Sequence, residues 1–210
     1  TIGPDKKKLE IEKSKNRTKI LIDGKEEKKQ SKLAQELAIQ SIHPNSHSLI
    51  EGPPSERRAF LDWGLFHVEH EFRKEWSGYI KILRQRNEAL KTGGGDEKTW
   101  MEKLAVSGES VSILREKYVL GLEKSIVETQ KFLMPESEII FYYEKGWGEE
   151  KSFMESLVEK RSLDMDRGYT SSGPQNADIR ITLNGREAQK ICSRGQQKLI
   201  ANIMLLSQAK

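Results

Sequence analysis

Hydrophobic positions along this chain follow two different patterns. Near both ends, short apolar stretches, most of them alternating with polar residues, predict β-strands, because successive side chains of a strand point to opposite faces. The strand-like stretches are KLEIEK (8–13), TKILID (18–23), SEIIFYYE (137–144) and ADIRITLNG (177–185). The first two flank the segment SKNR and predict an antiparallel hairpin, and Asp23-Gly24 and Asn184-Gly185 predict turns.

In the middle of the chain, apolar residues recur at steps of three and four, which indicates helices with one apolar face. A first long helix is predicted to be capped by Ser55, and a second follows the glycine-rich loop KTGGGDEKT (91–99). The two apolar stripes are Leu61, Leu65, Val68, Phe72, Trp76, Tyr79, Leu83 and Leu90, and then Val111, Leu114, Tyr118, Leu122 and Ile126. We expect these stripes to pack against each other in an antiparallel helical hairpin.

Shorter helices complete the pattern. They are predicted over 26–41, with Leu33, Leu37 and Ile39 on one side, over SFMESLVEKRSLDMD (152–166), and from about Ser193 onward, whereas 42–54 reads as irregular. Strands near both ends and helices between them predict a sheet-containing head domain with a helical segment inserted into it.

Composition narrows the class of protein. Charged residues make up 32% of the 210 residues and hydrophobic residues 35%, and no apolar run approaches the roughly 20 residues that span a bilayer. We therefore expect a protein that acts off the membrane, and the single cysteine, Cys192, favours a reducing, cytosolic compartment. The chain begins at Thr1 and stops at Lys210 inside a predicted helix, so we expect a fragment of a larger protein.

Charge is unevenly distributed. The net charge is +4, and residues 5–32 hold eleven Lys/Arg and six Asp/Glu, which gives +5 there and −1 in the remainder. A basic end is compatible with a nucleic-acid partner, and an ordinary solvated hairpin is the alternative.

The closing stretch CSRGQQKLIANIMLLSQAK (192–210) carries the sharpest chemical signal. Ser193 and Gln196 have the spacing of a capping box, in which each side chain bonds the backbone amide of the other residue. Gly195 adds no side chain to the first turn, and Arg194 adds a positive charge. Free amides and the positive end of the helix dipole make such a start a candidate anion site, and a helix that is merely well capped is the alternative.

Other chemistry is weakly signalled. Hydrolysis of ATP needs a P-loop and an acidic magnesium motif, and neither is present in this sequence. The segment GGGDEKT (93–99) has Glu97 where a P-loop needs Gly, so we interpret this segment as a flexible loop. The four histidines do not form a zinc pattern, so no metal site and no catalytic residue is predicted. A helix start near Cys192 could lower its pKa.

Two arginines open the first long helix. Arg57 and Arg58 could contact DNA phosphate, or they could pair with Glu56 and Asp62 of the same helix. The residues alone leave both alternatives open.

Several stretches, in the same order along nearly the whole chain, resemble one family. SRGQ before an apolar helix resembles the signature motif of ABC-type ATPases, and the form with Arg194 resembles the RecF family of DNA replication and recombination-repair proteins. The other matching stretches are GPPSERRAFLDWGLFHVE (52–69), LRQRNEALK (83–91) and YTSSGPQNADIRI (169–181).

The resemblance implies a mixed α/β fold, with portions of an ABC-type ATPase head and an inserted antiparallel helical lobe. It divides the chain into a head part (1–52), the helical lobe (53–135) and a return to the head with the signature helix (136–210). It also implies that Ser193, Arg194, Gly195 and Gln196 contact ATP held by a partner subunit, and that the P-loop and the Mg²⁺ motif lie outside this chain.

The implied role is that of a weak DNA-dependent ATPase. It would form ATP-driven homodimers on single- and double-stranded DNA at gaps or junctions, help to load recombinase with RecR/RecO-type proteins, and support the SOS response in the cytoplasm at the nucleoid. An SMC-like ATPase, which predicts longer coils, and a non-catalytic helical interaction module are the alternatives.

The chain departs from the family pattern at four positions. Cys192 replaces a usual Leu, Gln175 and Asn176 stand where His and a basic residue are common, and Asn45 stands where many members have an acid. Any phosphate contact by the missing basic residue, and any metal or water contact by the missing acid, is therefore not expected here.

Overall fold

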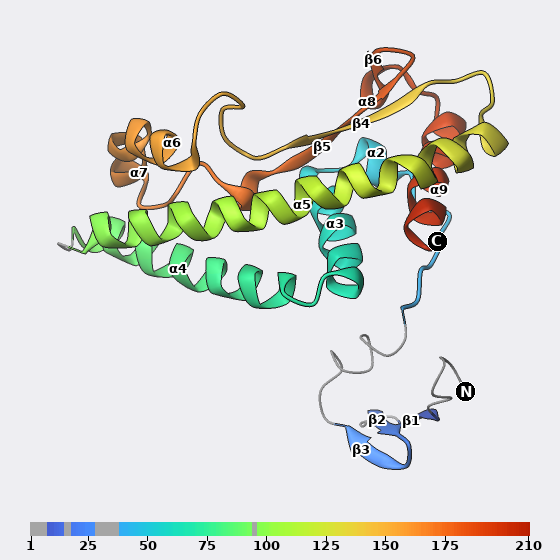
Figure 1. Ribbon diagram of the computed structural model, residues 1–210, viewed down its shortest axis with the longest axis horizontal. Helices are drawn as coiled ribbons and strands as arrows, with labels where there is room; N and C mark the ends of the chain where they lie inside the picture. Colours follow the sequence, from blue (N-terminus) through green and yellow to red (C-terminus); the bar gives the residue numbers. More distant parts are fainter. Residues whose placement is uncertain (1–7, 15–17, 28–37, 94–95) are drawn as a thin grey trace. The chain divides into compact units, whose positions relative to one another are not determined.

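The computed structural model describes residues 8–14, 18–27, 38–93 and 96–210. The chain divides into two units, Thr1–Ser41 and Ile42–Lys210, whose elements are labelled in Figure 1. None of the helices in the described ranges is both long and apolar enough to cross a membrane.

The first unit contains a three-stranded antiparallel sheet in the order β1-β2-β3. Its strands are β1 (Leu9–Lys13), β2 (Thr18–Ile22) and β3 (Lys25–Glu27). Asp23 and Gly24 both have positive φ, 50° and 77°, as the favoured two-residue hairpin turn requires. The predicted hairpin and its following turn are therefore confirmed.

The helix predicted over 26–41 is wrong at both of its ends. Glu26 and Glu27 belong to β3 because the turn at Asp23-Gly24 returns the chain along β2, and residues 38–41 have no regular secondary structure. The middle of the prediction, with Leu33 and Leu37, lies outside the described residues.

The second unit combines helices with a second antiparallel sheet, in the order β4-β5-β6. Its longer elements are α3 (Pro54–Val68), α4 (Phe72–Thr92), α5 (Glu97–Leu133), β4 (Ile139–Glu144), β5 (Asp178–Leu183) and α9 (Arg194–Gln208). Its short elements are α2 (Ser48–Glu51), α6 (Phe153–Glu159), α7 (Arg161–Arg167), the 3₁₀ turn η1 (Pro174–Asn176), β6 (Arg186–Glu187) and α8 (Ala188–Ile191). The strands predicted at 137–144 and 177–185 are confirmed, whereas α2 lies in a stretch predicted to be irregular and 152–166 forms two helices.

The predicted first long helix is two helices. The chain leaves helical geometry at Glu69, with φ −122° and ψ 100°, and resumes at Phe72. Ser55 is not the cap, because Pro54 occupies the first helical position, which proline favours, and Pro53 precedes it in extended conformation. The predicted antiparallel hairpin is formed by α4 and α5, which run side by side on either side of Gly93 (Figure 1), a left-handed helix end at φ +64°.

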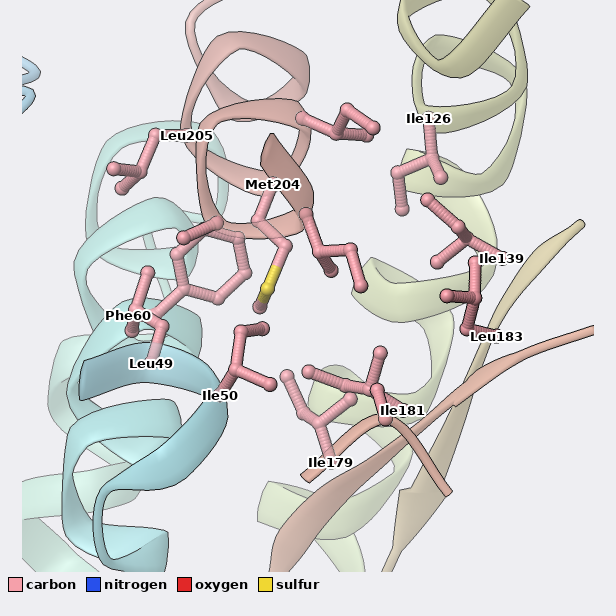
Figure 2. Close-up of a cluster of buried hydrophobic side chains, with 14 of the residues drawn as sticks. Leu49, Ile50, Phe60, Ile126, Ile139, Ile179, Ile181, Leu183, Met204 and Leu205 are labelled. Atoms are coloured by element: carbon pink, nitrogen blue, oxygen red, sulfur yellow. The ribbon is translucent and has the colours of Figure 1, made fainter. Parts of the chain in front are cut away.

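Two hydrophobic clusters hold this unit together. One packs α3, the carboxyl-terminal half of α5 and α9 against one face of the β4–β5 pair, with Met204 near its middle (Figure 2). The other packs α4 against the amino-terminal half of α5, with Tyr79 and Leu104 fully buried and Phe153 of α6 inserted beside them. The predicted stripes thus pack inward, except that Val68 is exposed at the end of α3.

Candidate functional site

The start of α9 has the geometry that the sequence predicts. Ser193 is in extended conformation, with φ −62° and ψ 159°, and its hydroxyl accepts a hydrogen bond from the Gln196 amide at 3.3 Å. The Gln196 side chain accepts from the Ser193 amide at 2.9 Å, so both halves of the capping box are formed. Burial of Ile200 and Ala201 against the core fixes the direction of the helix behind this start.

The capping box leaves two amides for a ligand. The Gln197 amide donates to the Ser193 carbonyl at 2.9 Å, whereas no acceptor bonds the amides of Arg194 and Gly195 within the described part of the chain. The first amides of a helix lack intrahelical acceptors, and the dipole adds partial positive charge at the same point. The arrangement can therefore receive an anionic oxygen.

The approach to these amides is open. Ser193, Arg194, Gly195 and Gln196 are all exposed. A Cβ built on Gly195 would meet only the Ser193 hydroxyl, at 3.9 Å, so no other group covers the turn. Arg194 and, one turn later, Lys198 are exposed, and neither has an ion pair among the described residues. Two cations beside free amides favour a phosphate over a neutral ligand.

The pKa of Cys192 is shifted in the direction opposite to the one that its position near a helix start suggested. Burial raises the pKa of its thiol instead of lowering it. Cys192 directly follows α8 and lies against the first hydrophobic cluster, and the loss of solvent around the thiolate causes this rise.

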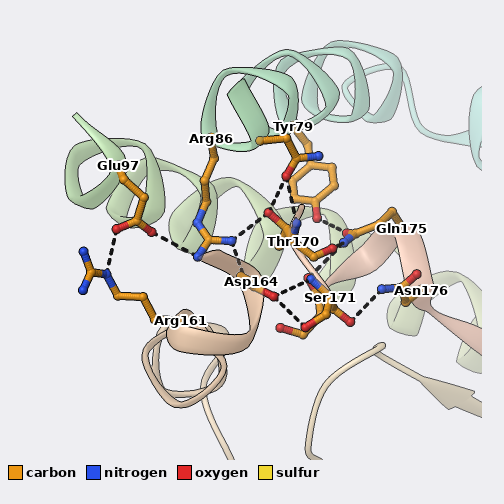
Figure 3. Close-up of polar contacts among 11 residues, drawn as sticks. Tyr79, Arg86, Glu97, Arg161, Asp164, Thr170, Ser171, Gln175 and Asn176 are labelled. Atoms are coloured by element: carbon orange, nitrogen blue, oxygen red, sulfur yellow. Dashed lines mark hydrogen bonds and ion pairs between the residues drawn. The ribbon is translucent and has the colours of Figure 1, made fainter. Parts of the chain in front are cut away.

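The loop before β5 is fixed by a buried ionic network (Figure 3). Arg86 of α4 has no exposed surface and donates to Asp164 at 2.8 Å, Thr170 at 2.7 Å and Glu97 at 3.1 Å. Asp164 also accepts from the amide and hydroxyl of Ser171, at 2.9 and 2.6 Å. Side chains from α5, α7 and the loop before β5 therefore converge on one guanidinium of α4, and the loop is tied to the helical hairpin.

Two departures from the family pattern lie in this loop. Gln175 accepts a hydrogen bond from the Tyr79 hydroxyl and donates to the Ser172 carbonyl at 2.9 Å, and Asn176 donates to the Ser171 carbonyl at 3.0 Å. Burial raises the pKa of Tyr79, so this hydroxyl keeps its proton and remains a donor. Both amide side chains thus hold the loop in place, while Asn45 is exposed in the segment before α2.

Arg57 is occupied by internal contacts. Its exposed fraction is 5%, it forms a two-bond ion pair with Asp178 at 2.7 and 2.9 Å, and it donates to the carbonyls of Leu49 and Gly52 at 3.2 and 2.9 Å. Its acidic partner is therefore on β5 and not on its own helix. This pair joins α3 to β5 and to the end of α2.

Arg58 is partly buried and donates to the Ala177 carbonyl at 2.9 Å. Burial lowers its pKa, with a further contribution from the positive charge of Arg115. Asp62 pairs with Arg115 at 2.8 Å, and Arg115 also lies 4.5 Å from the centre of the Trp76 ring. DNA contact by Arg57 and Arg58 stays a prediction, and the geometry favours it less for Arg57.

Glu97 and His47 contact oppositely charged side chains of this chain. Glu97, which fills the place of a P-loop glycine, begins α5 and pairs with both Arg86 and Arg161, so residues 97–99 are helical instead of forming a loop. His47 pairs with Glu51 at 3.1 Å. The described ranges contain no group of three or more His, Cys, Asp or Glu that could hold a metal ion.

Comparison with known proteins gives the context for this site. No protein-family model matches the chain. The DNA replication and repair protein RecF of Pseudomonas aeruginosa (strain LESB58) is 38% identical over 192 residues, which cover 90% of this chain and 52% of that protein. The protein of the same name from Chromohalobacter salexigens is 36% identical over 194 residues, covering 91% and 54%.

Solved structures show the same fold. The recombination mediator protein RecF with ATP, from the RecFOR pathway, superposes with a TM-score of 0.84 at 23% identity over 96% of this chain and 58% of that chain. A second structure of that protein, named RecF-ATPrS, gives a TM-score of 0.80 at 24% identity with the same coverage.

The fold and the signature-like helix start define the class: the chain has the mixed architecture of an ABC-type ATPase head with an inserted helical lobe. The sequence matches then support the assignment of the chain to the RecF family. It spans about half the length of the curated relatives that it matches. The boundaries predicted at residues 52 and 135 stay predictions.

Proposed function

We propose that this chain contributes the signature side of a composite ATP site in a DNA replication and repair protein. The observation that carries the proposal is the exposed, fully capped start of α9, where the Arg194 and Gly195 amides point to no acceptor among the described residues. The names of the relatives and the ATP in the similar RecF structure support the assignment of the anion to a nucleotide phosphate.

The similarity to RecF proteins supports action across an interface between subunits. In this proposal the P-loop of one subunit holds ATP and Mg²⁺, and Ser193 and Gly195 of the other subunit meet the γ-phosphate. Because the amides at the helix start are already oriented, binding costs little further ordering. ATP thereby joins two subunits, and hydrolysis removes the phosphate that links them.

The wider role follows from the family. ATP-driven dimers would form on DNA at gaps or junctions and help to load recombinase with RecR/RecO-type proteins, and they would support the SOS response. The cytoplasm, at the nucleoid, is the proposed location, and the Arg57–Arg58 start of α3 is a candidate DNA contact through Arg58.

A competition experiment tests this function. The 210-residue chain should bind ATP no better than millimolar by calorimetry, because it offers a signature without a P-loop. Added in excess to the complete protein, it should nevertheless inhibit ATP-driven dimerisation by occupying ATP-loaded P-loops. The Ser193→Arg chain, with bulk and charge at the contact, should not inhibit. Inhibition by both chains alike, or by neither, would show that the start of α9 does not meet nucleotide.

A further inference from the structure

Helix α4 carries a strip of basic and polar side chains along its exposed side. At about 100° per residue, these nine exposed positions fall within about 120° of the helix circumference, opposite the buried Tyr79 and Leu83. They are Arg73, Lys74, Ser77, Lys81, Arg84, Gln85, Glu88, Lys91 and Thr92. Five cations and one acid give this basic strip a net charge of +4.

The cations of the basic strip are available to a ligand. Lys74, Lys81 and Arg84 form no ion pair with any residue that the structure describes. Lys91 pairs with Glu88 at 3.0 Å, but both side chains are more than half exposed, at 57% and 66%, so solvent screens this pair. Figure 1 shows α4 along the side of α5 away from β4 and β5, so neither strand covers the strip.

Exposure alone does not explain the single sign of the strip. On α5, the exposed side carries both signs in near balance, as at Glu116-Lys117 and Glu123-Lys124. On α4, Lys81 and Arg84 are instead three residues apart on neighbouring turns, a spacing at which like charges destabilise a helix. A polyanion bound along α4 removes this repulsion.

The length of the strip suits an extended polyanion. Arg73 and Lys91 mark its ends, so at 1.5 Å per residue the strip runs for about 27 Å along the helix axis. Double-stranded DNA places a phosphate of each strand about every 3.4 Å along its axis, so this length matches about eight phosphates of one strand.

The chemistry of the strip fits the backbone of a duplex. Lysine, arginine and side chains such as Ser77 and Gln85 donate to phosphate oxygens, and these contacts carry no sequence information. Proteins that hold single strands add aromatic rings on which the bases stack. Within α4, which the structure describes throughout, the strip has no aromatic residue: Tyr79 is buried, and the Trp76 ring is covered by Arg115, whose guanidinium lies 4.5 Å from the ring centre.

We propose that the basic strip of α4 binds the phosphate backbone of double-stranded DNA without reading its sequence. The inference rests on the proposed function, in which the complete protein acts on DNA, and it identifies a surface that holds the duplex. The strip shares no residue with Ser193–Gln196 or with Arg57 and Arg58, so it is a separate contact. Because each cation that meets a phosphate releases a counterion, the strip makes the affinity for DNA depend on salt.

Removal of three charges from the strip tests this assignment in the complete protein. In Lys74→Gln/Lys81→Gln/Arg84→Gln, glutamine keeps a high helix propensity and removes the charge. Fluorescence anisotropy with labelled duplexes of two unrelated sequences, with ATP and over a range of salt concentrations, measures the affinity. We expect a loss of at least about tenfold at low salt for both sequences. The slope of log affinity against log salt should become shallower by about two to three, since each lost phosphate contact removes about 0.9.

The matched control removes the same charge from another exposed helix face. Lys117→Gln/Lys124→Gln/Lys131→Gln takes three exposed lysines from α5 and changes the net charge equally, so it should leave the affinity and the slope close to those of the wild type. An equal loss for the two triple variants would assign the effect to overall charge and overturn the proposal. An unchanged slope for the α4 variant, or a loss confined to single-stranded DNA, would also overturn it.

Dimerisation without DNA separates this inference from the proposed function. The α4 variant should still dimerise with ATP in light scattering, because the strip lies outside the start of α9. If the wild-type protein does not dimerise with ATP, the composite ATP site is wrong, while the difference between the two triple variants in DNA binding still tests the strip. Circular dichroism verifies that both variants fold. A folded α4 variant that loses ATP-driven dimerisation together with DNA binding would assign the strip to dimer formation and contradict the DNA contact.

Discussion

Replacement of Arg86 by methionine tests whether the buried ionic network holds the loop before β5. Arg86→Met keeps much of the side-chain volume and removes the charge. The change deletes hydrogen bonds of 2.8 Å to Asp164, 2.7 Å to Thr170 and 3.1 Å to Glu97. Asp164, which has no exposed surface, keeps only its bonds from Ser171.

The expected cost follows from what remains buried. Removing one partner of a buried pair typically costs about 3–5 kcal/mol, because a carboxylate stays desolvated without a cation. Glu97 retains Arg161 at 2.8 Å, so Asp164 accounts for most of the loss. We therefore expect Arg86→Met to lower the free energy of unfolding by about 3–5 kcal/mol.

Urea denaturation followed by circular dichroism measures this loss. A matched control is Arg180→Met, which removes an ion pair with Glu144 of similar length, 2.9 Å, whose side chains are 44% and 42% exposed; it should cost at most about 1 kcal/mol. The triple change Arg86→Met/Asp164→Asn/Glu97→Gln should be less destabilising than Arg86→Met alone, because no buried charge is left unpaired. Equal losses for Arg86→Met and Arg180→Met would refute the reasoning.

Three further predictions concern packing, backbone and reactivity. Phe72→Ala should cost about 3–5 kcal/mol in denaturation, because the ring is 2% exposed in the cluster between α4 and α5, and a loss near zero would show that the stripe is misplaced. Gly173→Ala should lower the free energy of unfolding by about 1–3 kcal/mol or more, because φ is +127° and the new Cβ would lie 2.6 Å from the Phe153 ring. Gly78→Ala is the control: it has open space around it and should be neutral or stabilising. Alkylation of Cys192 should rise with pH at higher values than for a free thiol, because burial raises its pKa, and a profile shifted to lower pH would contradict this.

Local chemistry made some elements predictable. The Asp23-Gly24 and Asn184-Gly185 turns and the Ser193–Gln196 capping box depend on neighbouring residues only, and all three are confirmed. The boundary between α3 and α4 gave no such signal, because Val68 and Phe72 continue the spacing of four across the break. A periodic pattern cannot distinguish one helix from two that change direction between matching positions.

The buried ion pairs could not be predicted from the sequence, for a different reason. Arg57 pairs with Asp178, 121 residues away, and Arg86 pairs with Asp164, 78 residues away. Only the tertiary fold brings these groups together. Arginine and aspartate occur mostly on solvated surfaces, so the sequence alone does not mark these particular residues as buried. The one available hint was an arginine in a helix face otherwise occupied by core residues, as Arg86 is between Leu83 and Leu90.

The central claim is that Ser193 meets a phosphate held by another subunit, and ATP-dependent dimerisation of the complete protein tests it most directly. Ser193→Arg should leave ATP bound to the P-loop of its own subunit and abolish the increase in mass that ATP causes in light scattering. Ser152→Arg is the matched control, because Ser152 caps α6 with the same side-chain geometry and is also exposed, so it loses a cap of about 1 kcal/mol at a different place. We predict that Ser152→Arg dimerises with ATP and that Ser193→Arg does not. Normal ATP-driven dimerisation of Ser193→Arg would contradict the account and leave α9 as a helix that is only well capped.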